Sequence, residues 1–233
     1  MDSYQPSVPS SAELETRSFI QKVYAWMSGG LAVTGATALY MASDPQMIVN
    51  LVSNKLLFYG LLFGELGLVF FLAGWVKTME ANTAKFAFLF YAALTGVTTS
   101  VIFLVYTRGS IANTFFLTAG LFAIMSGWGY ATKTDLTTMG NFCFMGLIGI
   151  ILASVVNWWV RSPAVEWATT YIGILVFIGL TAYDTQKIKE MNVIGNEGTD
   201  EDTKEAISGA LTLYLDFINL FLKLLSATGK RRD

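Results

Sequence analysis

Long apolar stretches separated by short polar linkers dominate the chain from residue 24 onward. Each stretch is close to the ~20 residues that a helix needs to cross the hydrocarbon core of a bilayer. Strands of a membrane barrel would be about half as long and would alternate apolar with polar residues. The pattern therefore predicts an all-α integral membrane protein with seven transmembrane helices. The seven stretches cover residues 24–43, 56–76, 86–106, 111–130, 142–160, 164–183 and 207–225.

These stretches divide the chain into three parts. Residues 1–22 are a polar N-terminal tail that lacks the basic and apolar regions of a signal peptide. Residues 23–228 form the transmembrane domain, and residues 229–233 are a basic C-terminal end. The only long linker is 184–206, and we expect its acidic run, Asp200–Asp202, to lie in a solvated loop.

The composition supports a membrane location and excludes several classes of function. Only 14% of the 233 residues are charged, compared with about 25% in a soluble domain, so the outer surface must face lipid. The net charge of -2 and the absence of a basic stripe argue against a nucleic-acid partner. The chain has no histidine, which excludes HExxH zinc sites and Ser-His-Asp triads. The single cysteine, Cys143, lies in an apolar run and is expected to be a packing residue.

The distribution of basic residues predicts the orientation. Eight Lys and Arg residues lie in the tail and the even-numbered loops, and three lie in the opposite loops, which favours a cytoplasmic N-terminus. Seven full spans would place Lys223 and the basic residues at 230–232 outside, against this rule. Either the last stretch does not cross completely, or the first six set the orientation; we favour seven spans. The compact loops favour the inner membrane of a bacterium.

The most informative charged residues lie inside the predicted helices or at their ends. Asp216 lies in the middle of the seventh stretch, Asp184 closes the sixth, and Glu65 is halfway along the second. An isolated carboxylate at this depth costs several kcal/mol, so each needs a polar cavity or a partner. Lys223 lies two helical turns after Asp216 on the same face, with Asn219 between them. Asp184 is also compatible with an interfacial helix end, and Glu65 with a structural partner of Lys223.

Three motifs in order resemble the Bax-inhibitor (transmembrane Bax inhibitor motif) family in its compact bacterial form. They are YATKTDLTTMG at 130–140, AYDTQKIK at 182–189 and LYLDFINLF at 213–221. The likeness extends over residues 17–228. The resemblance implies two layers of three helices around a central seventh helix, and a pH-sensitive calcium leak controlled by an aspartate pair.

The resemblance also assigns residues. The aspartate pair matches Asp184 and Asp216, with Tyr183, Tyr214 and Asn219 as polar residues that support the pair or line the pore. Members of this family carry an acid in the second helix and a basic residue late in the seventh, suspected to form an ionic latch. Glu65 matches the acid, but Ser226 stands where the family often has Arg, so Lys223 is the nearest substitute. Lys77 loosely matches a further basic residue at the end of the second helix.

A pair of carboxyl groups is a suitable pH sensor in a chain without histidine. Two carboxylates about 4 Å apart repel by roughly 4 kcal/mol at an effective dielectric constant near 20. Since about 1.4 kcal/mol corresponds to one pH unit, such a pair holds a shared proton near cellular pH. The shared proton would join the sixth and seventh helices, and its loss would leave two anions that bind calcium transiently. We expect calcium as the permeant ion and no resident cofactor; the sequence leaves the pH direction of opening undetermined.

Three other functions were compared with a calcium leak. Aspartyl intramembrane proteases need a Gly-x-Gly-Asp motif, and Asp216 follows Tyr214 and Leu215 instead, so we do not expect an enzyme. A coupled transporter predicts inverted repeats, and no clear repeat is present. A regulatory protein that binds another membrane protein, such as a protease or a death-pathway partner, stays open as the alternative. Its partner could dock on the tail or on the 184–206 linker.

Overall fold

The computed structural model describes residues 10–232, and these residues are almost entirely helical. Residues 1–9 of the predicted tail and residue 233 of the predicted basic end lie outside the described residues. The helices are α1 (Ser11–Met41), α2 (Pro45–Ser53), α3 (Lys55–Trp75), α4 (Ala81–Thr99), α5 (Ile102–Val105), α6 (Arg108–Ala131), α7 (Thr137–Val160), α8 (Pro163–Met191) and α9 (Asp200–Thr228), with a 3-10 turn, η1 (Val76–Thr78), after α3.

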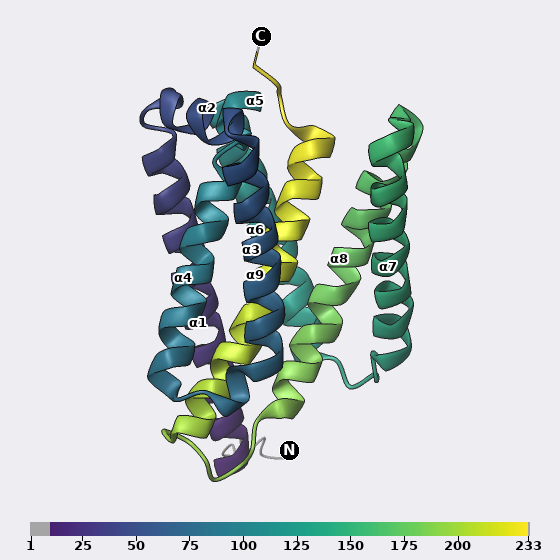
Figure 1. Cartoon of the computed structure of the whole chain (residues 1–233). Helices are drawn as coiled ribbons and strands as arrows, with labels where there is room; N and C mark the ends of the chain where they lie inside the picture. Colours follow the sequence, from purple (N-terminus) through teal and green to yellow (C-terminus); the bar gives the residue numbers. More distant parts are fainter. Residues whose placement is uncertain (1–9, 233) are drawn as a thin grey trace.

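Six segments are long and apolar enough to cross a membrane: Lys55–Thr78, Ala81–Val105, Arg108–Ala131, Thr137–Val160, Pro163–Met191 and Asp200–Thr228. They contain the six predicted stretches from 56–76 to 207–225, except that 86–106 extends one residue past Val105. The remaining stretch, 24–43, lies mostly in α1, which runs along the bundle beside them (Figure 1). Ser28, Thr34 and Thr37 lower the hydropathy of this helix, which is not among the six. An all-α membrane protein is therefore confirmed. That α1 also crosses the membrane, which would make seven spans in total, stays a prediction.

The N-terminal helix begins earlier than the apolar pattern indicated. Ser10 and Glu13 form a capping box: the Ser10 hydroxyl accepts the Glu13 backbone N–H at 3.3 Å, and the Glu13 carboxylate accepts the Ser10 N–H at 2.9 Å. These bonds satisfy N–H groups that the first helical turn leaves free. The polar residues 11–22 are consequently the first turns of α1, continuous with the stretch that follows.

The long linker and its solvated acidic loop were wrong predictions. Helix α8 continues to Met191 and α9 begins at Asp200, so the connection is only residues 192–199. The acidic run forms the first turn of α9, where carboxylates interact favourably with the helix dipole. Asp202 is only 2% exposed, because it lies 2.7 Å from the Lys22 ammonium of α1 and also accepts the Gly198 N–H. Hydropathy placed this turn in a loop because its stabilising partner is distant in the sequence.

Helix α9 contacts most of the other long helices. It packs against α1, α4, α6 and α8, and it touches α3. Of these helices, α4 also contacts α1 and α3, whereas α8 also contacts α6 and α7. Large apolar side chains on the outside of the bundle are exposed, including Phe63, Phe70, Trp159 and Leu175, as expected for a surface that faces lipid. The beginning of α1 and the end of α9 lie at opposite ends of the bundle, and α9 runs along its whole length (Figure 1).

Two glycines allow α8 to approach its neighbours closely. A Cβ atom at Gly129 of α6 would overlap the backbone carbonyl of Ala182, and one at Gly140 of α7 would overlap the ring of Tyr183. Small residues are the usual means of bringing helix backbones together in lipid, where helix association depends on close packing. Both contacts immediately precede Asp184, so they determine where that carboxyl group lies.

We predict that Gly129→Ala lowers stability whereas Gly120→Ala on the same helix does not. The new methyl group at residue 129 has no space, and overpacking costs about 1–3 kcal/mol. At Gly120 the methyl group meets no atom within 4 Å. Thermal unfolding of the two purified variants tests this difference. Equal melting temperatures would show that α6 and α8 can separate at this point without cost.

Candidate functional site

The carboxyl group of Asp184 on α8 and that of Asp216 on α9 are neighbours, close enough to form a hydrogen bond when one of them is protonated. Asp216 is 5% exposed, and Asp184 is partly buried. Among the described residues, Asp216 Oδ2 is buried and receives no hydrogen bond from any donor group. Two ionised carboxylates have no hydrogen to donate, so a bond between these groups requires one proton. The structure thus brings together the two acids that the sequence analysis singled out.

The loop before α7 holds the segment that carries Asp184. The Gln186 side chain accepts the Leu136 N–H at 2.8 Å and donates to the Thr134 carbonyl at 2.9 Å. The Lys189 ammonium donates to the Tyr130 carbonyl at 3.0 Å and lies over the Tyr130 ring. These bonds join the motif at 130–140 to the motif at 182–189. The two motifs therefore form one structural unit that positions the end of α8.

A series of hydroxyl groups leads from α1 to the residue after Asp184. Tyr24 of α1 hydrogen bonds to Ser126 of α6, and Ser126 hydrogen bonds to Thr185 of α8 at 2.7 Å. Thr185 in turn donates to the Thr181 carbonyl, one turn earlier in its own helix, at 2.7 Å. Sequence reasoning missed this series, because single hydroxyl residues in apolar helices carry no signal of which partner they will meet.

The three predicted supporting residues have other contacts in this structure. Tyr214 is fully buried and hydrogen bonds to Thr34 of α1 at 2.7 Å, with Tyr91 packed edge-on against its ring. Asn219 donates to the Leu215 carbonyl of its own helix at 2.8 Å. Tyr183 packs against Gly140. Tyr214 therefore joins α9 to α1 and α4, and Tyr183 joins α8 to α7; their predicted role in supporting the pair remains untested.

The structure does not bring the three predicted latch residues together. Glu65 accepts hydrogen bonds from the Thr95 and Thr98 hydroxyls of α4, at 2.6 and 2.8 Å. The aliphatic part of Lys223 lies against Gly173 of α8, and Lys77 is exposed in η1. Among residues 10–232, no ion pair joins Glu65 to either lysine. The three-residue spacing of Thr95 and Thr98, which places both hydroxyls on one face of a helix, was the sequence signal that could have identified the partners of Glu65.

The paired carboxyls can hold one proton or, when both are ionised, contribute oxygen ligands to a hard cation. Calcium takes about 6–8 oxygen ligands, more than the four that two carboxylates provide. Water or backbone carbonyls would therefore complete the shell, an arrangement suited to brief occupancy. The chemistry available at Asp184 and Asp216 is proton and cation binding between two helices.

We predict that the melting temperature of the wild-type protein falls as pH rises from about 6 to 8. Loss of the shared proton leaves two anions in contact, and each kcal/mol of their repulsion lowers the melting temperature by about 2–4 °C. In Asp216→Asn the amide donates to Asp184 at every pH, so the dependence should be flat.

Asp135→Asn is the matched control for this experiment. Hydrogen bonds from the side chain and backbone N–H of Thr137 lower the pKa of the exposed Asp135, which is therefore ionised throughout this range. This variant should keep the wild-type slope. A slope that persists unchanged in Asp216→Asn would contradict proton sharing.

Comparison with known proteins identifies the family. The family model described as inhibitor of apoptosis-promoting Bax1 matches residues 16–233. The inner membrane protein YbhL of Escherichia coli K12 is 49% identical over 217 residues, which cover 93% of this chain and 93% of YbhL. An uncharacterized protein of Borreliella burgdorferi is 45% identical over 92% of this chain and 93% of its own length. An uncharacterized membrane protein of Streptococcus pyogenes, SpyM3_0260, is 33% identical over 95% and 96% of the two chains. The chain is a multi-pass membrane protein and belongs to the Bax1-I family, as its three motifs indicated.

Proposed function

We propose that this protein is a pH-sensitive calcium leak channel, gated by a proton shared between Asp184 and Asp216. The contact between these two carboxyl groups, made by α8 and α9 inside membrane-spanning segments, is the observation that supports the proposal. An acid at this depth is costly unless it has a function or a partner. The proposed role is passage of an ion, with calcium as cargo, and no catalysed reaction.

The proposed gate is the α8–α9 contact. With one proton bound, the carboxyl pair joins the two helices and closes the pathway beside them. Without that proton the carboxylates repel each other, and a divalent cation becomes their favourable partner. A contact with two arrangements that differ by one proton is sufficient for a switch. The Glu65, Lys77 and Lys223 side chains would form the proposed latch only in an arrangement other than the present one.

In this proposal α1 spans the membrane in addition to the six apolar segments, which gives seven spans. Helices α1, α3 and α4 form one layer and α6, α7 and α8 the other, with α9 between them. The packing of α9 against helices of both layers supports this arrangement. The N-terminus would then face the cytoplasm and the C-terminus the opposite side of a bacterial inner membrane. The Tyr24–Ser126–Thr185 hydroxyls would support the position of Asp184 from the α1 side.

We predict that Asp184→Asn and Asp216→Asn each flatten the pH dependence of calcium flux into proteoliposomes between about pH 6 and 8. Release of one proton changes the closed population by at most about tenfold per pH unit, and neither variant can release it. Asp135→Asn, the same change in an exposed loop, should keep the wild-type profile. Flux is measured with purified protein alone in the liposomes.

Two results would contradict the proposal. Unchanged pH profiles in both folded variants would exclude the aspartate pair as the sensor. A wild-type protein that passes no calcium at any pH would instead favour a regulatory protein that binds another membrane protein without ion transport.

A further inference from the structure

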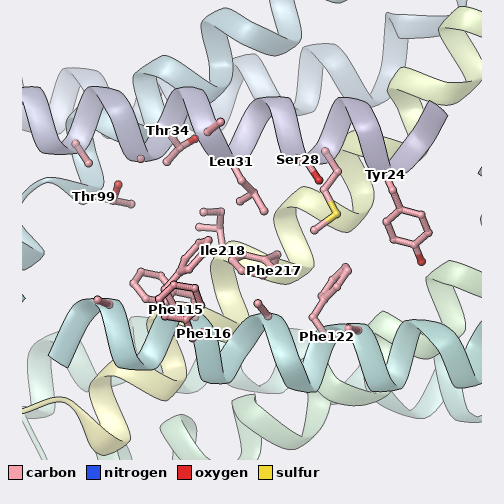
Figure 2. Close-up of a pocket in the computed structure, with 18 of the residues that line it drawn as sticks. Tyr24, Ser28, Leu31, Thr34, Thr99, Phe115, Phe116, Phe122, Phe217 and Ile218 are labelled. Carbon is pink, nitrogen blue, oxygen red and sulfur yellow. The ribbon is translucent and has the colours of Figure 1, made fainter. Parts of the chain in front are cut away.

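A long cavity of about 1200 Å³ lies between α1 and α6 on the side of the bundle. Figure 2 shows its construction: Leu31 projects from α1, Phe115 and Phe122 from α6, and Phe217 with Ile218 from α9, which forms the floor. Both α1 and α6 pack against α9, and the cavity occupies the space between them. We call this cavity the α1–α6 groove.

The groove is apolar and as long as the membrane is thick. Its lining along α1 runs from Arg17 to Leu39, which is about 33 Å at 1.5 Å per residue and close to the ~30 Å of a hydrocarbon core. Phe115 packs edge-on against Phe217, with ring centroids 5.4 Å apart, and the neighbouring Phe116 is 71% exposed. A groove of this length and chemistry, open on the lipid-facing side, suits a hydrocarbon chain.

The end of the groove at Arg108 is strongly basic. Arg108 lines the groove and donates to the Ala42 carbonyl at 3.2 Å. The C-terminal segment is attached beside it: Thr107 N–H donates to the Lys230 carbonyl at 3.1 Å, and the Arg232 guanidinium donates to the Phe103 carbonyl at 2.9 Å. Within the described residues, the side chains of Arg108 and of the basic segment 230–232 form no ion pair. Positive charge therefore collects at this mouth, and none of these basic side chains is ion-paired with a carboxylate of the described residues.

The opposite end of the groove has acidic residues close to its basic ones. Arg17 lies there, one helical turn after Glu13. The next residue, Ser18, donates to the Glu197 carboxylate at 2.5 Å. Lys22 is paired with Asp202 at 2.7 Å. An anionic group is consequently attracted more strongly to the Arg108 end, where fewer carboxylates lie near the basic side chains.

We propose that the α1–α6 groove binds an acyl chain of an anionic phospholipid, whose phosphate headgroup lies beside Arg108 and the C-terminal basic segment. The bilayer surrounds the groove with such molecules, and each Lys or Arg near the headgroup adds attraction for an anionic lipid. This site is independent of the proposed calcium leak.

Native mass spectrometry of the full chain, titrated with phosphatidylglycerol or phosphatidylcholine, tests the proposal. We expect one phosphatidylglycerol to bind in preference to phosphatidylcholine. Gly35 lines the groove and a Cβ there meets no atom within 4 Å, so Gly35→Leu fills the groove without disturbing the backbone and should abolish this binding. Gly120→Leu on α6, equally open but outside the groove lining, is the matched control and should bind like wild type.

Charge variants test the headgroup end separately. Arg108→Gln should lower the preference for phosphatidylglycerol about fivefold, the loss expected for one basic side chain near an anionic lipid. Arg231→Gln should act in the same direction without touching the Arg108–Ala42 hydrogen bond, and Lys55→Gln, an exposed basic residue outside the groove, should have no effect.

Each remaining outcome overturns the proposal. Binding that survives in Gly35→Leu would place the lipid elsewhere. If the wild-type protein bound phosphatidylglycerol and phosphatidylcholine equally well, an anionic headgroup at this mouth would be excluded. The same conclusion would follow if neither Arg108→Gln nor Arg231→Gln changed the preference for phosphatidylglycerol. Failure of wild type to bind either lipid would exclude the site altogether.

Discussion

A buried carboxyl group at the centre of α9 is the constraint that organises this protein. Asp216 lies at membrane depth in the helix that contacts most of the others, and water cannot solvate it there. Its neighbour is the carboxyl group of Asp184, so the end of α8 must lie close to the middle of α9. Gly129 and Gly140 permit this approach, and the Gln186 bonds to the loop at 132–136 keep it in place. Much of the local packing follows from the need to pair one acid.

Two other polar side chains inside the bundle are satisfied by hydroxyls. Glu65 is held by Thr95 and Thr98, and the Tyr214 hydroxyl meets Thr34. A hydroxyl donor satisfies a carboxylate without removing a second charge from water, which makes it less costly than a buried ion pair. Asp202, near the end of the bundle, has the ion pair instead, because its partner Lys22 still reaches solvent. The choice of partner thus follows depth in the membrane.

Helix α9 presents different chemistry on different faces. Phe217, Ile218 and Phe221 form the floor of the groove, whereas Leu220 and Leu224 pack into a cluster with residues of α7 and α8. Asp216 is adjacent to both surfaces. A movement of α9 relative to α8 would therefore be felt at the groove as well as at the carboxyl pair, which makes this helix the natural link between the two regions.

The membrane class, the apolar centres of the long helices and the two important acids could be derived from the sequence, because hydropathy and charge act residue by residue. Asp184 and Asp216 stood out since a carboxyl in an apolar helix is costly whatever surrounds it. The motifs at 130–140 and 182–189 were recognised as a set, but only the tertiary structure shows that Gln186 and Lys189 bind one to the other.

Partners distant in the sequence were decided by the tertiary structure alone. Asp202 belongs to the first turn of α9 because Lys22 and Gly198 bind it there. Glu65 meets threonines of α4, although the sequence analysis considered a lysine of α9. The α1–α6 groove exists because two helices pack on α9 without filling the space between them. Hydropathy reports whether a residue prefers lipid or water; which side chain it meets depends on how the helices pack, and that information is spread over the whole chain.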